Sequence, residues 1–173
     1  GSVSVVRASD NTVVDTVSVG AYPAGVTVLP NGSRVYVGDD YGDVSAIRTS
    51  DNTVVANIQL NSATELTAAP NGDYVYVADA PNVVSVIQTS SNTAVDTVPV
   101  GNGPRQLAVL PNGEYVYVAN SADGTVSVMR TSDNTVVGTV TVGREPTGVA
   151  AHPDGNFVYV TNRSSNSVSV IGF

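Results

Sequence analysis

The sequence lacks cysteine, tryptophan and lysine altogether, and it has only one histidine and one methionine. Without cysteine there are no disulfides and no thiolate zinc sites. Because lysine is absent, all seven basic residues are arginines, and against fifteen acidic residues they leave a net charge of −8. An acidic surface of this kind argues against nucleic acid or an anionic membrane as a partner. No run approaches the ~18 apolar residues of a membrane helix, so we expect no membrane insertion.

Valine, serine, threonine, asparagine and glycine are abundant instead, which is typical of strands and tight turns. The 173 residues are 42% apolar, enough for one domain with a sizeable core. Short apolar segments alternate with Gly, Pro, Asn, Asp or Ser, and no segment shows sustained helical periodicity. The sequence therefore predicts an all-β chain.

One strand pattern recurs four times along the chain. It places a tyrosine between two valines after a Pro-Asn-Gly or Pro-Asp-Gly turn, at Tyr36, Tyr76, Tyr117 and Tyr159, which are 40, 41 and 42 residues apart. Four short strands in each period of this length describe one blade of a β-propeller. We predict a single β-propeller domain over residues 1–173, built of four-stranded antiparallel blades, four repeats per chain. The repeats cover approximately residues 3–43, 44–83, 84–125 and 126–167, followed by a closing strand at 168–173.

Residues 111–137 carry a family resemblance. Residues 111–120 read Pro-Asn-Gly-Glu-Tyr-Val-Tyr-Val-Ala-Asn, Thr-Val-Ser-Val follows at 125–128, and Asn-Thr-Val-Val at 134–137. This pattern resembles the YVTN family of β-propeller repeats, and residues 159–162 match the name motif itself. The resemblance implies propellers of about seven blades, common in bacterial and archaeal surface or exported proteins, hence an extracellular or cell-surface location. It implies no shared catalytic residue. The chain departs from the family at Arg7, Arg48, Gln88 and Arg130, where an Asp is usual.

By analogy with the family, the strand after Gly25 is innermost, the Tyr36 strand second, the Val44 strand third and the Val54 strand outermost. The chain then begins with the two outer strands of a blade and ends with three inner ones. Either the N- and C-terminal strands pair within one chain to close a four-bladed ring, or two chains combine into an eight-bladed ring. A fragment of a longer propeller is a third interpretation. The predicted oligomeric state is thus a monomer or a homodimer formed by ring closure, with a slight preference for the single-chain ring.

Residues that break the repeat template are candidates for a ligand site. Glu65 and Gln106 replace the glycine of the Pro-x-Gly entry to the innermost strand. The candidate polar pocket at the channel mouth consists of Glu65, Arg105, Gln106, Arg144 and Glu145. The structural alternative is a Glu65–Arg105 ion pair that only fills the entrance. Tyr22 and Tyr41 are expected on the same face, where they could stack on a sugar ring or a peptide.

A metal site has only weak support in the sequence. Asp39, Asp40 and Asp43 gather three carboxylates in one loop, but their spacing matches no established calcium loop, and we expect a solvated turn. His152 occupies the position of Leu29, Ala69 and Leu110, so a packing role is expected. We predict no cofactor and no catalytic residue.

The function predicted from the sequence is that of a non-catalytic propeller module, an interaction scaffold for a protein, a small ligand or a glycan. A propeller hydrolase of the lactonase type with a channel metal is one alternative. A carbohydrate-binding propeller is the other.

Overall fold

The computed structural model describes residues 1–172; the last residue of the predicted closing strand, 173, lies outside the described part. Seventeen strands form five antiparallel sheets, and one short 3-10 helix, η1 (Arg163–Ser165), lies between the last two strands. The N-terminal two-stranded sheet comprises β1 (Ser2–Arg7) and β2 (Thr12–Ser18). The first four-stranded sheet comprises β3 (Pro23–Val28), β4 (Arg34–Asp39), β5 (Asp43–Arg48) and β6 (Thr53–Gln59).

The remaining three sheets repeat this plan along the chain. The second four-stranded sheet comprises β7 (Glu65–Ala68), β8 (Tyr74–Asp79), β9 (Val83–Gln88) and β10 (Thr93–Pro99). The third comprises β11 (Pro104–Val109), β12 (Tyr115–Asn120), β13 (Thr125–Arg130) and β14 (Thr135–Thr141). The C-terminal sheet has three strands, β15 (Pro146–Ala151), β16 (Phe157–Asn162) and β17 (Ser167–Gly172).

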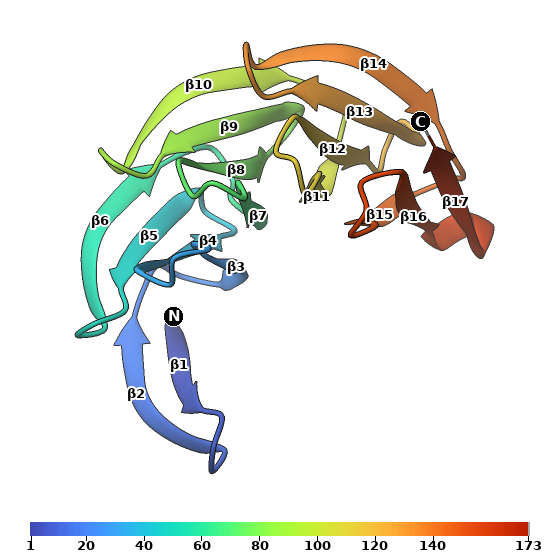
Figure 1. The fold of residues 1–173 in the computed structure, drawn as a ribbon. Coiled ribbons are helices and arrows are strands. Elements are labelled where there is room, and N and C mark those ends of the chain that lie inside the picture. Colours follow the sequence, from blue (N-terminus) through green and yellow to red (C-terminus); the bar gives the residue numbers. More distant parts are fainter. Residues whose placement is uncertain (173) are drawn as a thin grey trace.

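The sheets stand face to face in a curved row, with β3, β7, β11 and β15 on the inner side of the arc and β6, β10 and β14 on the outer side (Figure 1). The predicted all-β fold of four-stranded antiparallel blades is confirmed, as is the predicted strand order within a blade. Among residues 1–172, no helix is long and apolar enough to cross a membrane.

The turns that separate the strands use residues suited to left-handed backbone. The Pro-Asn-Gly turn before β12 ends at Gly113, whose φ is +76°, a conformation that costs glycine nothing. The turn before each outermost strand places an asparagine in the same region, with φ between 53° and 57° at Asn11, Asn52, Asn92 and Asn134. These short turns fix the register in which neighbouring strands pair.

The core consists of separate layers, one at each junction between consecutive blades. Tyr36, Tyr76 and Tyr117 are each at most 2% exposed, because each lies between its own sheet and the next one. Tyr36, for example, belongs to the same buried cluster as Leu66 and Val77 of the following blade. Burying an aromatic side chain at each junction makes neighbouring blades depend on one another for stability.

Polar side chains also link the layers. The Tyr36 hydroxyl donates a hydrogen bond to Asn92 Oδ1 of the next blade at 2.7 Å. Asn52 Nδ2 donates to Asp15 Oδ2 of the preceding sheet at 2.9 Å, and Asn134 repeats this bond to Asp96 at 2.9 Å. Because such bonds require defined geometry, they fix the angle between adjacent blades more closely than apolar contacts alone would.

The expectation that the N- and C-terminal strands of one chain pair is wrong for residues 1–172. Strand β1 pairs with β2 and β17 pairs with β16, in different sheets, and the two ends of the arc lie apart (Figure 1). Four blades would have to turn by about 90° at each junction to close a ring. The five sheets of this chain turn less than that, and their arc stays open (Figure 1). One chain therefore forms an open arc with three complete blades and two partial ones.

Candidate functional site

A polar groove lies where the innermost strands of four successive blades converge. It has a volume of about 370 Å³ and is lined by Ala24, Asp40, Thr64, Glu65, Arg105, Gln106, Glu145, Thr147 and Arg163. Four of the five residues of the predicted polar pocket are among these, and each blade contributes residues from the start of its innermost strand, from the loop before it or from the segment that follows its tyrosine strand. The structure therefore brings Glu65, Arg105, Gln106 and Glu145 together.

Glu65 is the first residue of β7 and replaces the glycine found at the same point of β3. Its side chain is half-buried, and among residues 1–172 its carboxylate makes no hydrogen bond or ion pair. Burial raises the pKa of Glu65. The alternative prediction of a Glu65–Arg105 ion pair is wrong within the described part of the chain. Glu65 is thus a partly desolvated acid without a compensating cation.

Arg105 is exposed, and its guanidinium makes no hydrogen bond or ion pair with any residue of 1–172. It still acts at a distance on Glu145. Hydrogen bonding from the Ser164 hydroxyl, aided by the positive charges of Arg163 and Arg105, lowers the pKa of Glu145. Arg163 Nη1 lies 3.0 Å from Glu145 Oε1. The groove thus holds one arginine that is paired and one, Arg105, whose donors are all available.

Two loops entering the innermost strands carry side chains in an unusual backbone conformation. Tyr22 and Glu145 have φ of 56° and 55°, and the third blade has Gly103 at the same position with φ of 65°. A side chain in this region costs about 1–2 kcal/mol per residue relative to right-handed backbone. Glycine, as in the third blade, adopts this conformation without the cost. The first and last blades have a tyrosine and a glutamate there instead, and both side chains lie beside the groove.

Gln106 holds two blades together at the groove floor. Its Oε1 accepts a hydrogen bond from the backbone amide of Val149 in the next blade at 3.0 Å. The Gln106 side-chain oxygen therefore links two blades. Arg144 does not line the groove: its backbone amide donates to Ser165 Oγ at 2.7 Å, and its guanidinium donates to the Ser164 carbonyl at 3.4 Å. Arg144 shapes the loop that follows β16.

Tyr22 and Tyr41 lie together at one end of the groove, next to the lining residues Ala24 and Asp40. They are 68% and 66% exposed, and their rings meet edge to face with centroids 5.6 Å apart. The prediction that the two share a face therefore holds as a statement of position, whereas their use in stacking on a sugar or peptide stays a prediction.

The three aspartates of the β4–β5 loop do not converge on a common point. Asp39 is buried and its Oδ1 accepts hydrogen bonds from the amides of Tyr41 and Asp43, both at 2.9 Å, so it stabilises the turn. Asp40 points to the groove and is exposed. Within residues 1–172, no group of three or more His, Asp or Glu side chains is placed to hold a metal ion.

The packing role expected for His152 is wrong. The residue is partly exposed in a surface turn, with Nδ1 2.7 Å from Asp154 Oδ1.

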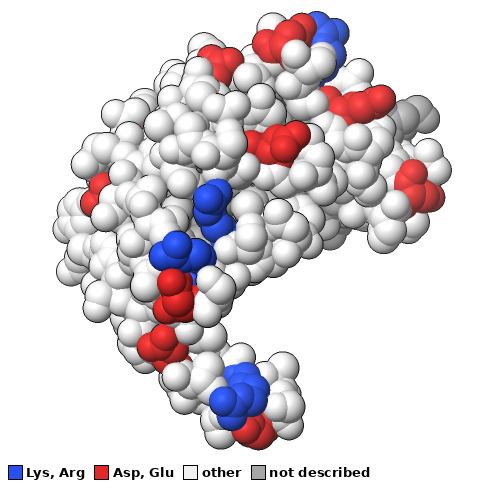
Figure 2. All heavy atoms as spheres, turned by 60° about the vertical axis from the view of Figure 1, so that its left-hand side comes forward, with Lys and Arg blue, Asp and Glu red and all other residues white. Residues whose placement is uncertain are grey.

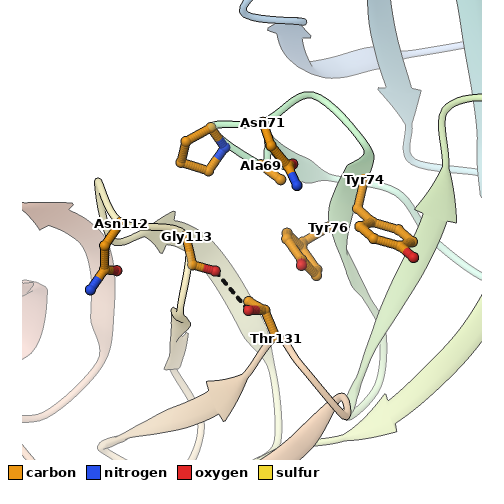
Figure 3. Close-up of a pocket in the computed structure, with 8 residues that line it drawn as sticks. Ala69, Asn71, Tyr74, Tyr76, Asn112, Gly113 and Thr131 are labelled. Carbon is orange, nitrogen blue, oxygen red and sulfur yellow. Dashed lines mark hydrogen bonds between the residues drawn. The ribbon is translucent and has the colours of Figure 1, made fainter.

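A second cavity, of about 400 Å³, lies between the second and third complete blades at the Pro-Asn-Gly turns. Figure 3 shows Tyr74 and Tyr76 on one side of it, Asn112 on the other, and the Thr131 hydroxyl bonded to the Gly113 carbonyl between them at 2.6 Å. At the preceding junction Arg34 stands where Tyr74 does, and its Nη1 donates to the Thr89 carbonyl across the junction at 2.6 Å. No sequence pattern predicted this cavity as a site. Its signal was the change from arginine to tyrosine at one repeat position.

Three arginines outside the groove form ion pairs with an aspartate three residues further along the chain. Arg7–Asp10, Arg48–Asp51 and Arg130–Asp133 form exposed ion pairs at 3.1, 3.0 and 2.5 Å. Figure 2 shows small groups of charges on a largely uncharged surface, with basic and acidic groups side by side at the tip of the N-terminal hairpin. Exposed pairs of this kind add little stability and mark no site.

Comparisons with known proteins agree with the fold. The chain resembles the hydrazine synthase of Kuenenia stuttgartiensis (TM-score 0.86, 24% identity), with 92% of this chain and 49% of that one covered. It also resembles a functionally unknown protein from Desulfotomaculum acetoxidans DSM 771 (TM-score 0.79, 18% identity, 94% and 60% covered). A third similar structure is the Cps50 (Swd1) β-propeller domain of Myceliophteria thermophila (TM-score 0.83, 10% identity, 94% and 56% covered).

These identities show the fold alone, and the chain spans about half to three-fifths of the length of the three structures. No curated protein sequence matches the chain. A family profile does match it, over residues 42–145 and again over residues 87–173, so that most of the chain is covered. The chain therefore belongs to the family described as Lactonase, 7-bladed beta-propeller.

Proposed function

We propose that the chain is a non-catalytic binding module of a β-propeller, and that its polar groove holds a small ligand carrying a carboxylate together with hydroxyl or amino groups. The observation that carries the proposal is the pair of unsatisfied groups in one groove, the Arg105 guanidinium and the half-buried Glu65 carboxylate. A guanidinium is suited to a ligand carboxylate, and a desolvated carboxylate gains most from a hydrogen-bond donor.

The location of the groove supports the same proposal. Ligand sites prefer concave regions where several elements converge, and this groove draws on four blades. The acidic surface and the resemblance to exported propellers lead us to propose an extracellular or cell-surface setting. There the module would serve as a scaffold for a protein or glycan carrying the ligand group.

Galacturonate and galactose test the proposal as a matched pair, because they differ in one carboxylate. We expect titration calorimetry to show binding of galacturonate and none of galactose. The variant R105Q should weaken binding at least tenfold, whereas R7Q, in the distant N-terminal hairpin, should leave it unchanged. Equal binding to wild type and R105Q, or no binding of galacturonate, would contradict the proposed groove site.

Carbohydrate binding through the tyrosine pair predicts a different result. Galactose and galacturonate would then bind alike, and the double variant Y22A/Y41A would lose both. The specific observation behind this candidate is the exposed, mutually contacting pair of rings, of which Tyr22 occupies a strained backbone position.

Lactone hydrolysis is a further candidate because of the family to which the chain belongs. Glu65 would accept a proton from a water molecule that adds to the lactone carbonyl, and Arg105 would stabilise the resulting oxyanion. The ring C–O bond then breaks, and the proton returns to the departing alkoxide. Proton release from γ-butyrolactone, followed at constant pH, tests this. Release above the uncatalysed rate that disappears in E65Q would favour the enzyme, and release equal to the blank would exclude this substrate class.

A further inference from the structure

The cavity between the second and third complete blades is open where the preceding junction is filled. At that preceding junction the half-buried Arg34 reaches the next blade, and its Nη1 donates to the Thr89 carbonyl at 2.6 Å. Tyr74 stands at the position of Arg34 and lines the cavity instead (Figure 3). The Thr131 carbonyl, which corresponds to that of Thr89, accepts no hydrogen bond from any residue of 1–172. The acceptor of the first junction is therefore present at the second, but its donor is not.

A smaller buried side chain widens the same space. The residue before the turn proline is leucine in two of the complete blades, at Leu29 and Leu110, and alanine in the other, at Ala69. Each of the three belongs to the buried cluster that contains the tyrosine of its own blade. Ala69 lines the cavity of about 400 Å³. Because alanine leaves more room at this wall than leucine would, the cavity is a property of this junction and not a general gap between blades.

The Tyr76 hydroxyl lacks the partner that its counterpart has. The Tyr36 hydroxyl donates to Asn92 Oδ1 at 2.7 Å. Asn134 stands at the position of Asn92, but its Nδ2 donates at 2.9 Å to Asp96, on the outermost strand of the same blade as Tyr76. Tyr76 is 2% exposed and lines the cavity, and its hydroxyl makes no hydrogen bond with any residue of 1–172. Figure 3 shows its ring between Tyr74 and Thr131. A buried hydroxyl without a partner is costly, so a bound polar group would gain from it.

We propose that this cavity binds the guanidinium group of a small ligand, in the place that the Arg34 guanidinium takes at the preceding junction. A guanidinium has N–H donors and no acceptor, and the Thr131 carbonyl and the Tyr76 hydroxyl can both accept from it. The ring of Tyr74 at the cavity wall attracts a cation as well. The net charge of −8 also favours a cationic ligand over an anionic one.

The first junction shows that such a site needs no carboxylate. Arg34 forms no ion pair within residues 1–172, although it is half-buried, and its recorded hydrogen bond goes to a neutral carbonyl. The walls of the second cavity are likewise uncharged. A guanidinium is more weakly hydrated than an ammonium, so it is the cation best suited to neutral acceptors in a partly buried place.

The ionisation of the two tyrosines reflects the filled and the open junction. Burial raises the pKa of Tyr36, but a hydrogen bond and the positive charge of Arg34 oppose this rise. No cation opposes it at the second junction, where burial and the neighbouring Tyr74 raise the pKa of Tyr76 to about 12. A guanidinium in the cavity would act on Tyr76 as Arg34 acts on Tyr36.

This site is separate from the polar groove. The groove includes Glu65 at the start of β7, whereas the cavity includes Ala69 and Pro70, which directly follow the other end of that strand. The two can therefore be tested independently, and the failure of one proposal leaves the other standing.

Butylguanidinium and butylurea test the proposal as a matched pair, because they have nearly the same shape and only the first is a cation. Titration calorimetry should show binding of butylguanidinium and none of butylurea. A69L, which restores the leucine of the other blades, and Y74R, which supplies a guanidinium from the chain itself, should each abolish binding. Y76F should weaken it about tenfold, the usual effect of losing one hydrogen bond to a charged group. Circular dichroism confirms that each variant is folded.

E65Q is the control, since the half-buried Glu65 carboxylate of the groove is the other place that attracts a cation. E65Q should bind butylguanidinium as the wild type does. Binding that persists in A69L and Y74R, or no binding by the wild type, would overturn the proposal. Equal binding of butylammonium would overturn the choice of a guanidinium.

A measurement on the wild type alone guards against variants that fail to fold. Intermolecular nuclear Overhauser effects from the butyl chain should reach the Ala69 methyl group and the Tyr74 ring. Contacts only with residues outside the cavity would contradict the site.

Discussion

The middle of the arc and its two ends are made from the same repeat but differ in burial. The sheet of β7–β10 is covered on both faces, and Tyr76 and Leu66 lie in separate core layers on its two sides. At the ends, Tyr159 and Val26 occupy the same repeat positions but are 40% and 58% exposed, because the partial sheets leave these parts of the blade faces uncovered. A blade of this kind is not an independent unit, because half of its core belongs to the next one.

The difference also separates structural from functional signals. The exposed tyrosine and valine at the ends are the same apolar residue types that are buried at these positions in the middle blades. Such exposure indicates a face for another part of a propeller rather than a ligand site. The groove is the opposite case. Its residues differ from the repeat template although the fold of the blade does not require the change. Glu65 is partly buried without a partner that would stabilise its charge.

The largest expected effect comes from truncating the same tyrosine in both regions. Tyr76→Ala should cost about 3–5 kcal/mol of unfolding free energy, because it opens a cavity between two blades. Tyr159→Ala should cost about 1 kcal/mol in dilute solution, since its side chain is already partly hydrated. Urea unfolding of both variants measures the contrast. A Tyr159→Ala cost that grows with protein concentration would point to coverage by a second copy, and equal costs at all concentrations would break the comparison.

The opposite blade face gives a second pair. Leu66 packs against Gly25 of the preceding blade, so Leu66→Ala should lose about 2–4 kcal/mol. Val26→Ala is expected to change the unfolding free energy of the dilute chain by less than about 0.5 kcal/mol. Thermal unfolding followed by circular dichroism checks both. A large loss for Val26→Ala in dilute solution would show that the N-terminal face is covered within one chain.

The two middle junctions can be made alike by one substitution. Tyr74→Arg should let the new side chain cross the cavity and donate to the Thr131 carbonyl, as Arg34 does to Thr89. We expect a gain of about 0.5–1 kcal/mol, the usual net value of one hydrogen bond. The reverse change, Arg34→Tyr, is the matched control and should lose a similar amount. If Tyr74→Arg is destabilising, the cavity is not a vacant copy of the Arg34 site.

The groove should show a pH signature of its own. Because burial raises the folded-state pKa of Glu65, the acid favours folding below its ordinary value of 4.5 and loses that contribution as pH rises through the folded pKa. Glu65→Gln should therefore raise the melting temperature slightly at pH 7 and leave it nearly unchanged at pH 3. A fall at pH 7 would mean that the carboxylate has a stabilising partner.

The smallest effect is expected at the outer rim. A hydrogen bond from Arg130 lowers the pKa of Asp133 to about 2, whereas the middle blade replaces this pair with Gln88 and Ser91. The stabilising effect of the charged form is present above the ordinary value of 3.8 and is lost as pH falls through about 2. Carboxyl NMR titration should give a midpoint near 2 in the wild type and a higher one in Arg130→Gln. An unchanged midpoint would assign the shift to Thr135 instead.

The sequence alone determined the blade. The spacing of Tyr36, Tyr76, Tyr117 and Tyr159, the turns before them and the apolar strands predict four-stranded sheets, because strand and turn formation depend on neighbouring residues. Template breaks also pointed to Glu65, Arg105 and Gln106, since a repeat supplies its own comparison. The sequence did not reveal that Arg144 lies outside the groove or that Arg163 lies inside it, because loop geometry decides both.

Only the tertiary structure decided whether the ends of the chain meet. Identical Ser-Val-Ser-Val strands can pair in several ways, and local sequence does not distinguish the partners. The angle at each junction results from the packing of whole sheets, and small differences in that angle add along the arc. Closure is therefore a property of the accumulated geometry and of what lies beyond each open face, and no single repeat encodes it.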